Sequence, residues 1–423
     1  MNRHVSDLSA LTEILGALGG FAQPADLTLR NYFRAHPGLG QKDRARLAET
    51  AFAWLRHWRT MRELAGDDPR AHALLALKRF GGLSARELSV DLSAREREWL
   101  RQALAREPSW EPAARAELPD WLYERLAAQW GATRALDFGR SVQQAAALDL
   151  RVNTERSSRD ELQAALIASG IACAPTPYSP LGLRLVGKPA LQNHALFRVG
   201  HFEVQDEGSQ LIGLLVQPTR RHLVVDLCAG AGGKTLALAA AMRGQGQIYA
   251  CDLVERRLRS LRERLTRSGL SNVQPWQIDG ETDPKLARLA GKADRVLVDA
   301  PCSGFGTLRR NPDLKWRHGE QAITELVAKQ KRILGAAAAL VKPGGRLIYA
   351  TCSILEEENE QQVEVFLRDR PDFRPLSAAV ILAAAKLPLD TGPYLRLLPE
   401  IHACDGFFAA VLERRESREA LPD

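Results

Sequence analysis

Apolar positions recur at helical spacing throughout the first third of the chain. Between residues 44 and 64, one stripe of a helix would carry Leu47, Ala51, Trp54, Leu55 and Trp58. Arginines fill the positions around this stripe. Ser93 and Glu96 have the spacing of a capping box, which marks the start of another helix. The pattern predicts an all-helical domain over residues 1–140.

The pattern changes after residue 140. Leu148 to Val152 is typical of a strand, and Ser158 with Glu161 predicts a capped helix that runs to about Ala168. Residues around Cys173 and residues 182–186 could add further strands. We therefore expect a small α+β domain over residues 141–219.

Short apolar runs alternate with amphipathic helices over residues 220–415. Strands are predicted at 222–227, 247–252, 273–279, 295–299 and 345–351. Strands that alternate with helices in this way indicate an α/β fold, a doubly wound Rossmann-like domain with a parallel sheet. Residues 394–398 and 407–412 have the pattern of a closing antiparallel pair.

Composition narrows the class of protein. The 423 residues are 45% hydrophobic and 26% charged, which excludes a disordered or fibrous chain. Asp7, Thr12 and Glu13 interrupt any signal-peptide core, and no apolar run reaches the ~20 residues of a membrane span. We expect a cytoplasmic protein without membrane contact. The net charge of +7 permits an anionic partner. Six cysteines without a Cys-x-x-Cys pair predict neither a disulfide framework nor a metal site.

A glycine-rich loop follows the first predicted strand of the α/β region, in Asp226-Leu-Cys-Ala-Gly-Ala-Gly-Gly-Lys-Thr235. Ala229 stands where a Walker loop needs its first glycine, and Thr235 stands where the dinucleotide fingerprint needs its last. These departures disfavour a nucleoside triphosphate or a dinucleotide. A different nucleoside-type ligand fits a loop that opens a helix on such a sheet.

Two aspartates end the next two predicted strands. A carboxylate at Asp252 can accept hydrogen bonds from both ribose hydroxyls, and one at Asp279 can accept them from an adenine amino group. Strand-end aspartates also serve as helix N-caps, which is the alternative for each residue taken singly. Together behind this loop they favour S-adenosylmethionine as the cofactor.

Two thiols also lie at carboxyl ends of predicted strands, the edge where open α/β sheets bind ligands. Cys302 lies in Asp299-Ala-Pro-Cys-Ser-Gly304, and Cys352 lies in Ala350-Thr-Cys-Ser353. A lone cysteine is usually a small buried hydrophobe. This pair is singled out because both members enter loops at the ligand edge.

The motifs around these residues resemble those of the Nop/Sun family of RNA cytosine methyltransferases, in the family's order. The same holds for Leu150-Arg-Val-Asn-Thr154, Gln205-Asp-Glu-Gly-Ser-Gln210 and Asp405-Gly-Phe-Phe408. Residues 39–49 resemble the NusB-like domain of the bacterial ribosomal RNA branch. The resemblance implies a class I methyltransferase domain over 220–415, an RNA-recognition-like domain over 141–219 and a NusB-like RNA-binding domain over 1–140.

The resemblance also assigns roles. Cys352 would attack carbon 6 of cytosine, Cys302 would assist release, Asp299 would hydrogen-bond the base, and Lys234 would lower a thiol pKa. The cofactor residues would be Cys228, Ala229, Gly230, Ala231, Gly232, Gly233, Lys234, Asp252, Asp279 and Asp299. An alternative makes Cys302 the nucleophile, because DNA cytosine methyltransferases use the cysteine of a Pro-Cys pair. The family loop Cys-Ala-Ala-Pro-Gly-Gly has lost its proline here, which leaves cofactor affinity open.

The segment after Cys302 is rich in cations. Arg309, Arg310 and Lys315 are predicted to hold RNA phosphates, with a solvated loop as the alternative. The expected substrate is small-subunit (16S) ribosomal RNA, with transfer RNA or large-subunit RNA as alternatives within the same chemistry, and the expected form is a monomer. An amino-methylating enzyme would need Asp/Asn-Pro-Pro-Tyr/Phe at residues 299–302, where Asp-Ala-Pro-Cys stands. A non-enzymatic RNA-binding assembly factor is the third hypothesis.

Overall fold

The computed structural model describes residues 3–84, 87–88, 92–108 and 111–416. The chain forms two compact units. One unit contains residues 1–145 and, from far along the sequence, residues 307–321. The other contains residues 146–306 and 322–423.

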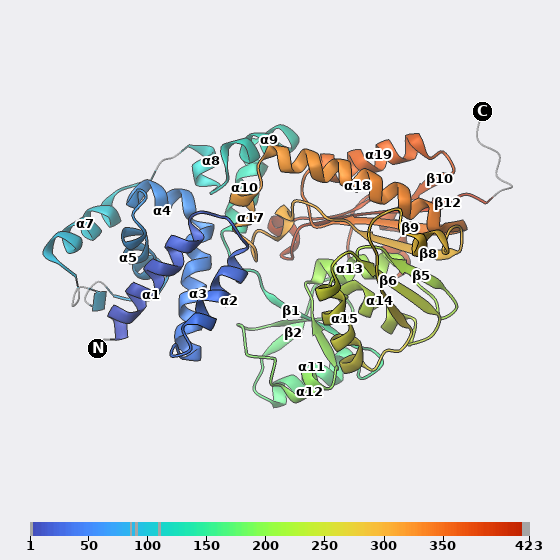
Figure 1. The fold of residues 1–423 in the computed structure, drawn as a ribbon, viewed down its shortest axis with the longest axis horizontal. Helices are drawn as coiled ribbons and strands as arrows, with labels where there is room; N and C mark the ends of the chain where they lie inside the picture. Colours follow the sequence, from blue (N-terminus) through green and yellow to red (C-terminus); the bar gives the residue numbers. More distant parts are fainter. Residues whose placement is uncertain (1–2, 85–86, 89–91, 109–110, 417–423) are drawn as a thin grey trace. The chain divides into compact units, whose positions relative to one another are not determined.

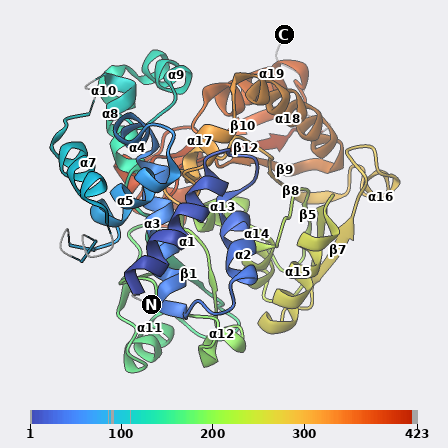
Figure 2. The same cartoon turned by 60° about the vertical axis from the view of Figure 1, so that its left-hand side comes forward.

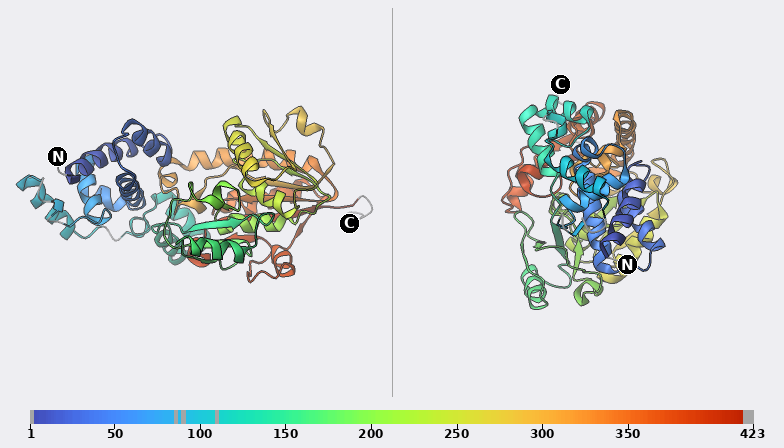
Figure 3. Two further views of the ribbon diagram at one scale, coloured as in Figure 1. Left: turned by 90° about the horizontal axis from the view of Figure 1, so that it is seen from below. Right: turned by 90° about the vertical axis from the view of Figure 1, so that its left-hand side faces the viewer.

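The first unit is helical, and Figure 3 draws its blue to teal residues as helices and loops. Its helices are α1 (Arg3–Leu18), α2 (Ala25–Ala35), α3 (Gln41–Arg56), α4 (Trp58–Ala65), α5 (Pro69–Arg79), α7 (Ala94–Ala105), α8 (Pro112–Arg115), α9 (Asp120–Trp130), α10 (Ala132–Val142) and α17 (Leu314–Arg317). The helix predicted over 44–64 is two helices, because His57 leaves helical geometry with φ of −107° and ψ of 29°. The predicted stripe is nevertheless the core, with Leu47, Ala51, Trp54 and Leu55 buried.

The second unit begins with a four-stranded antiparallel sheet in the order β2-β3-β1-β4. Its strands are β1 (Leu148–Val152), β2 (Cys173–Pro175), β3 (Gly182–Leu185) and β4 (Phe202–Val204), with helices α11 (Arg159–Ala168) and α12 (Ala195–Arg198). The predicted capping box at Ser158 and Glu161 is present at the start of α11. Alternate residues of β1, Leu150 and Val152, pack with α11 in a small core.

A larger mixed sheet follows, in the order β10-β12-β9-β8-β5-β6-β7, with β11 paired to β12. Its strands are β5 (Leu223–Asp226), β6 (Gln247–Asp252), β7 (Val273–Gln277), β8 (Ala293–Asp299), β9 (Val341–Thr351), β10 (Phe373–Leu376), β11 (Leu395–Leu397) and β12 (Phe407–Arg414). Strands β5 to β9 are parallel, and β12 pairs antiparallel with β9, β10 and β11. The expected doubly wound methyltransferase fold is confirmed.

Helices cover both faces of this sheet. They are α13 (Glu207–Val216), α14 (Gly233–Ala241), α15 (Glu255–Ser268), α16 (Pro284–Ala287), α18 (Glu320–Leu340), α19 (Glu360–Asp369), α20 (Ala378–Ala384) and α21 (Pro399–His402). Figures 1 and 2 show α18 and α19 on one face and α14 and α15 on the other. Val224 of β5 packs in the core with α14 and α15, and its neighbour Val225 packs in the core with α18 and α19. The strand therefore buries both faces, as parallel strands do.

Within the described ranges, no helix has the length and apolar character to cross a membrane.

Candidate active site

The loop between β5 and α14 turns at two glycines with positive φ. Gly230 has φ of +57° and Gly232 has φ of +82°, a backbone region that favours glycine. A Cβ on Gly232 would lie 2.1 Å from Cδ1 of Leu261, so the loop lies tightly against α15. A Cβ on Gly230 would meet nothing within 4 Å. The Gly230 N–H donates to the carboxylate of Asp252 at 2.9 Å, which joins the loop to the end of β6.

Two arginines hold the carbonyl oxygens of this loop. Arg264 of α15 donates to the carbonyl of Ala231 at 2.7 Å. Arg151 of β1 donates to the carbonyl of Gly233 at 2.6 Å and is itself 3% exposed. Charge-assisted hydrogen bonds of this kind are stronger than neutral ones. They fix a loop in which Ala231 stands where the resembling family has proline. Sequence reasoning missed both arginines as loop contacts, although Arg151 lies in the quoted Leu150-to-Thr154 motif.

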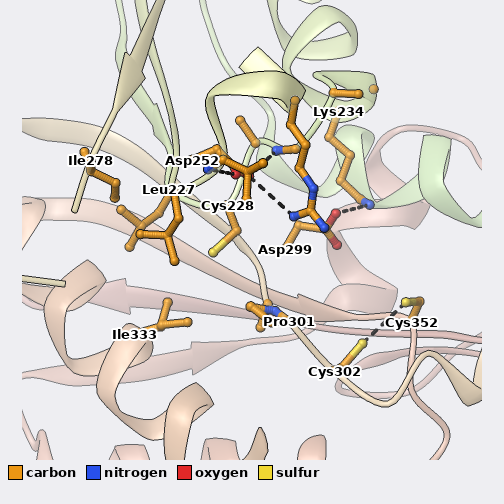
Figure 4. Close-up of a pocket in the computed structure, with 18 of the residues that line it drawn as sticks. Leu227, Cys228, Lys234, Asp252, Ile278, Asp299, Pro301, Cys302, Ile333 and Cys352 are labelled. Carbon is orange, nitrogen blue, oxygen red and sulfur yellow. Dashed lines mark hydrogen bonds and ion pairs between the residues drawn. The ribbon is translucent and has the colours of Figure 1, made fainter. Parts of the chain in front are cut away.

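A cavity of about 740 Å³ opens at the carboxyl ends of β5, β6 and β8. Its lining includes Leu227, Cys228, Ala229, Gly230, Ala231, Gly233, Lys234, Asp252, Ile278, Asp299, Pro301, Cys302, Ile333 and Cys352. Figure 4 shows Leu227, Ile278 and Ile333 on an apolar side and Lys234 with Asp299 on a polar side. Cavities of this size and mixed lining hold nucleoside-sized ligands. The apolar wall suits a flat base, and the Asp252 carboxylate suits ribose hydroxyls, so the residues fit the expected cofactor.

Two of the predicted cofactor residues are absent from this lining. Gly232 forms the tight turn against α15 and does not line the cavity. Asp279 is exposed, because β7 ends at Gln277, earlier than predicted. Its neighbours Ile278 and Gly280 do line the cavity, so contact between Asp279 and the cofactor stays a prediction.

Six polar residues line the cavity without having been predicted as cofactor contacts: Gln205, Ser209, Arg257, Arg264, Glu281 and Lys329. Gln205 and Ser209 come from the quoted Gln205-to-Gln210 motif and are joined by a hydrogen bond of 3.0 Å. The motif was the signal that could have identified them. Arg257 of α15 and Lys329 of α18 also line the cavity. In the sequence, residues 256–264 have the pattern of the solvated face of a core helix.

The two predicted reactive thiols face each other. Cys302 and Cys352 leave the neighbouring strands β8 and β9, and their sulfurs lie 3.4 Å apart, within hydrogen-bond distance for sulfur (Figure 4). Both side chains are half-buried and line the cavity. Parallel neighbours in a sheet end at one edge, which is why residues fifty positions apart meet here.

Lys234 and Asp299 form an ion pair beside the thiols. The Nζ of Lys234 lies 2.7 Å from Oδ2 of Asp299, and Lys234 is 8% exposed. Burial alone would lower the pKa of Lys234, but the charge and hydrogen bond of Asp299 raise it above its ordinary value, with a further contribution from Cys352. Lys234 therefore remains an ammonium group in the cavity wall.

Cys302 is held as a thiol. Its hydrogen bond with Cys352, its burial, and the charges of Cys352 and Glu358 raise the pKa of Cys302 well above its ordinary value. Lys234 interacts electrostatically with Cys352. Cys302 therefore keeps its proton.

The predicted RNA-binding cations belong to the helical unit. Lys315 is 1% exposed, and its Nζ donates to the carbonyl of Arg56 at 3.1 Å. Burial lowers the pKa of Lys315 to about 8. The prediction that Lys315 holds an RNA phosphate is wrong for this structure, because the ammonium group is enclosed. Arg309 and Arg310 are half-buried, and the carbonyl of Arg309 accepts a hydrogen bond of 2.9 Å from Arg56.

Comparison with known proteins places this geometry in a family. Residues 213–413 match the family model described as 16S rRNA methyltransferase RsmB/F, and residues 118–192 match the ferredoxin-like domain of RsmF/B-like methyltransferases. The second match begins within the helices, earlier than the boundary predicted at residue 141.

Individual relatives agree. A probable ribosomal RNA small subunit methyltransferase B from Synechocystis is 38% identical over 297 residues, which cover 70% of this chain and 66% of the relative. The matched region thus spans just under two thirds of that relative's length. The crystal structure of PH0851 superposes with a TM-score of 0.80 at 28% identity, over 96% of this chain and 98% of that one. A methyltransferase homolog from Pyrococcus horikoshii superposes with a TM-score of 0.62 at 28% identity, over 72% and 97% of the two chains.

Residues 213–413 therefore form a methyltransferase domain of the RsmB/F type, and the residues that line its cavity fit S-adenosylmethionine.

Proposed function

We propose that this enzyme methylates carbon 5 of cytosine in small-subunit (16S) ribosomal RNA through a transient bond between Cys352 and the base. The observation that carries the proposal is the pair of thiols 3.4 Å apart in the wall of the cofactor cavity. The names of the matched family and of its relatives support ribosomal RNA as the substrate class. An RNA partner also agrees with the positive net charge of +7.

Carbon 5 of cytosine is a poor nucleophile. Addition of a thiolate to the ring makes this carbon nucleophilic enough to accept a methyl group. Cys352 Sγ adds to carbon 6, forming a carbon–sulfur bond and moving the ring electrons toward carbon 5. S-adenosylmethionine, when bound, supplies an electrophilic methyl group on a sulfonium centre. Carbon 5 takes that methyl group, and the electrons of the broken bond stay on the cofactor sulfur.

Release requires one proton and one electron pair to move. The proton on carbon 5 leaves, its electron pair re-forms the 5,6 double bond, and the carbon 6–sulfur bond breaks with its electrons on Cys352. Cys302, 3.4 Å away, relays the proton to the departing sulfur and ends as a thiol again. The pKa of Cys302, raised by its hydrogen bond to Cys352 and by burial, suits this role better than attack on the ring. We therefore keep Cys352 as the nucleophile over the alternative assignment.

Lys234 and Asp299 are proposed to stabilise charged groups of the reaction, the thiolate and the base adduct. The Asp299 carboxylate can accept a hydrogen bond from the exocyclic amino group beside N3 of the base, which holds the base in place for the adduct. The Lys234 ammonium, 2.7 Å from Asp299, favours a thiolate at Cys352 and prevents an unpaired carboxylate in the cavity. Arg309, Arg310 and the helical unit are proposed to contact the RNA outside the cavity. Work on ribosomal RNA would place the enzyme in the cytoplasm.

The proposal is tested by methyl transfer from tritiated cofactor to purified RNA. We expect 5-methylcytosine in 16S RNA after nuclease digestion and chromatography, and loss of at least about 10³-fold in Cys352→Ala. Cys173→Ala changes a half-buried thiol of the small sheet and is the matched control with retained activity. Label on a different atom, or activity in Cys352→Ala, would overturn the chemistry. Faster labelling of transfer RNA or of large-subunit RNA would overturn the substrate, and no labelling with intact cofactor binding would favour an assembly factor.

A further inference from the structure

Each reactive cysteine is followed directly by a buried serine. Ser303 follows Cys302 and is 1% exposed, and Ser353 follows Cys352 and is 2% exposed. The two hydroxyl oxygens lie 3.1 Å apart. The cysteine loops therefore meet twice, once through their sulfurs in the cavity wall and once through their serines beneath it.

One carboxylate binds both serines. Glu358 is fully buried in the short turn η2 (Glu356–Glu358) that follows the second cysteine loop. Its Oε1 accepts a hydrogen bond from the Ser303 N–H at 2.9 Å, and its Oε2 accepts one from the Ser303 hydroxyl at 2.5 Å. The Ser353 hydroxyl also donates to Oε2. A single side chain thus joins two loops that are fifty residues apart in sequence.

A third element completes this arrangement. Gln330 of α18 donates from Nε2 to Oε1 of Glu358 at 2.9 Å and to the carbonyl of Pro301 at 2.9 Å. Glu358 therefore accepts four hydrogen bonds. A buried carboxylate is costly unless its oxygens are saturated in this way. An amide has one accepting oxygen and an NH₂ group that would face donors, so glutamine cannot replace it without loss.

The charge of Glu358 also acts on the Cys302 sulfur. It is one of the groups that raise the pKa of Cys302, after the hydrogen bond to Cys352, burial and the charge of Cys352. On the other side of the pair, Lys234 interacts with Cys352. The hydrogen bonds of Glu358 thus hold both cysteine loops, and its charge favours the protonated form of Cys302.

We infer that Glu358 is a positioning residue that, through Ser303 and Ser353, holds the two thiols at the spacing required for release of the methylated base. The inference rests on the proposed two-cysteine chemistry. It assigns Glu358 no contact with RNA or cofactor. Each serine follows its cysteine directly, so the two Cα atoms are about 3.8 Å apart. A shift of the serine hydroxyl therefore also shifts the neighbouring cysteine.

The test compares Glu358→Gln and Glu358→Asp with a matched control. Glu207→Gln removes another fully buried carboxylate of the same unit, whose hydrogen bonds come from the backbone N–H groups of Tyr178 and Ser179. Two readouts are used. Phenylarsine oxide bonds both sulfurs of a close dithiol, so its affinity reports thiol spacing without any RNA or cofactor. Single-turnover reactions with 16S RNA separate formation of the denaturant-stable protein–RNA adduct from its release.

We expect Glu358→Gln to weaken arsenical binding by about tenfold or more and to slow adduct release by a similar factor, with adduct formation affected less. Glu358→Asp should recover part of the arsenical affinity and part of the release rate. Glu207→Gln should match the wild type in both assays. Wild-type arsenical affinity and release in a folded Glu358→Gln variant would overturn the inference. If Glu358→Gln does not fold, the Ser303→Ala and Ser353→Ala pair decides in the same two assays. Absence of any adduct in the wild type would contradict the proposed function, whereas the arsenical result would still judge the role of Glu358.

Discussion

Replacing Lys234 by methionine tests whether its ammonium group favours the reactive thiolate. Methionine keeps most of the side-chain length and removes the charge that lies 2.7 Å from Asp299. At an effective dielectric constant of about 20, unit charges at that separation attract by about 6 kcal/mol. Water reaches Asp299, whose side chain is 33% exposed, and the variant no longer buries an ammonium group. We expect removal of this positive charge from the cavity wall to slow the step at Cys352 by about 30-fold, or about 2 kcal/mol, which is well below the attraction within the ion pair.

The assay is the rate of adduct formation with 16S RNA, together with alkylation of Cys352 by iodoacetamide. Both should fall by about 30-fold in Lys234→Met. The pKa of Lys234 is raised by Asp299 against the effect of burial, so its charge persists through the range from pH 6 to 9. The ratio of wild-type to variant rates should therefore be largest at pH 6 and should shrink toward pH 9, where a thiol ionises without the help of a nearby cation. Lys331→Met removes an exposed lysine of α18 and is the control. Wild-type rates in Lys234→Met at neutral pH would refute the reasoning.

Three further predictions follow from individual residues. Gly232→Ala should lower the free energy of unfolding by about 2–4 kcal/mol, because φ is +82° and the new Cβ would lie 2.1 Å from Leu261. Calorimetry should also show weaker cofactor binding. An unchanged free energy of unfolding and an unchanged affinity would contradict the assigned turn. Burial raises the pKa of Asp226 to about 7, so the wild type loses stability as pH rises from about 4, its unfolded value, to about 7. Asp226→Asn should lack this loss and gain up to about 3 kcal/mol relative to the wild type between pH 5 and 8 in urea melts, and parallel pH profiles would count against it. Lys315→Met should leave the salt dependence of RNA binding unchanged because Lys315 is 1% exposed, whereas a shallower slope would mean that it contacts phosphate.

Local signals in the sequence predicted local structure well. Ser158 and Glu161 sit three residues apart, and α11 begins there with the expected capping box. Strands β1 and β6 have the predicted bounds, because β1 alternates apolar with polar residues and β6 is an apolar run between Gln247 and Asp252. The glycines after the first predicted strand of the α/β region indicated the turn between β5 and α14, and the predicted strand ends placed Cys302 and Cys352 at one edge of the sheet.

Contacts between distant segments were not predictable in the same way. The stripe over residues 44–64 continues through His57, so its pattern does not show that the helix axis changes there. Lys315 reads as a surface cation by composition, but residues 307–321 pack with the helical unit and bury it. Glu358 carries no mark in sequence, because its role depends on two loops that meet only in the folded sheet. Burial of a charged group is decided by tertiary neighbours, which periodicity does not encode.

The central claim is a carbon–sulfur bond between Cys352 and cytosine that Cys302 helps to break. Its most direct measurement is a denaturing gel of Cys302→Ala incubated with 16S RNA and S-adenosylmethionine, followed by mass spectrometry of the cross-linked peptide. The account predicts a protein–RNA band that accumulates with time, carries a methylated cytosine on Cys352, and vanishes when Cys352→Ala is added to the same variant. Normal turnover of Cys302→Ala without such a band, or a wild-type adduct that maps to Cys302, would contradict it.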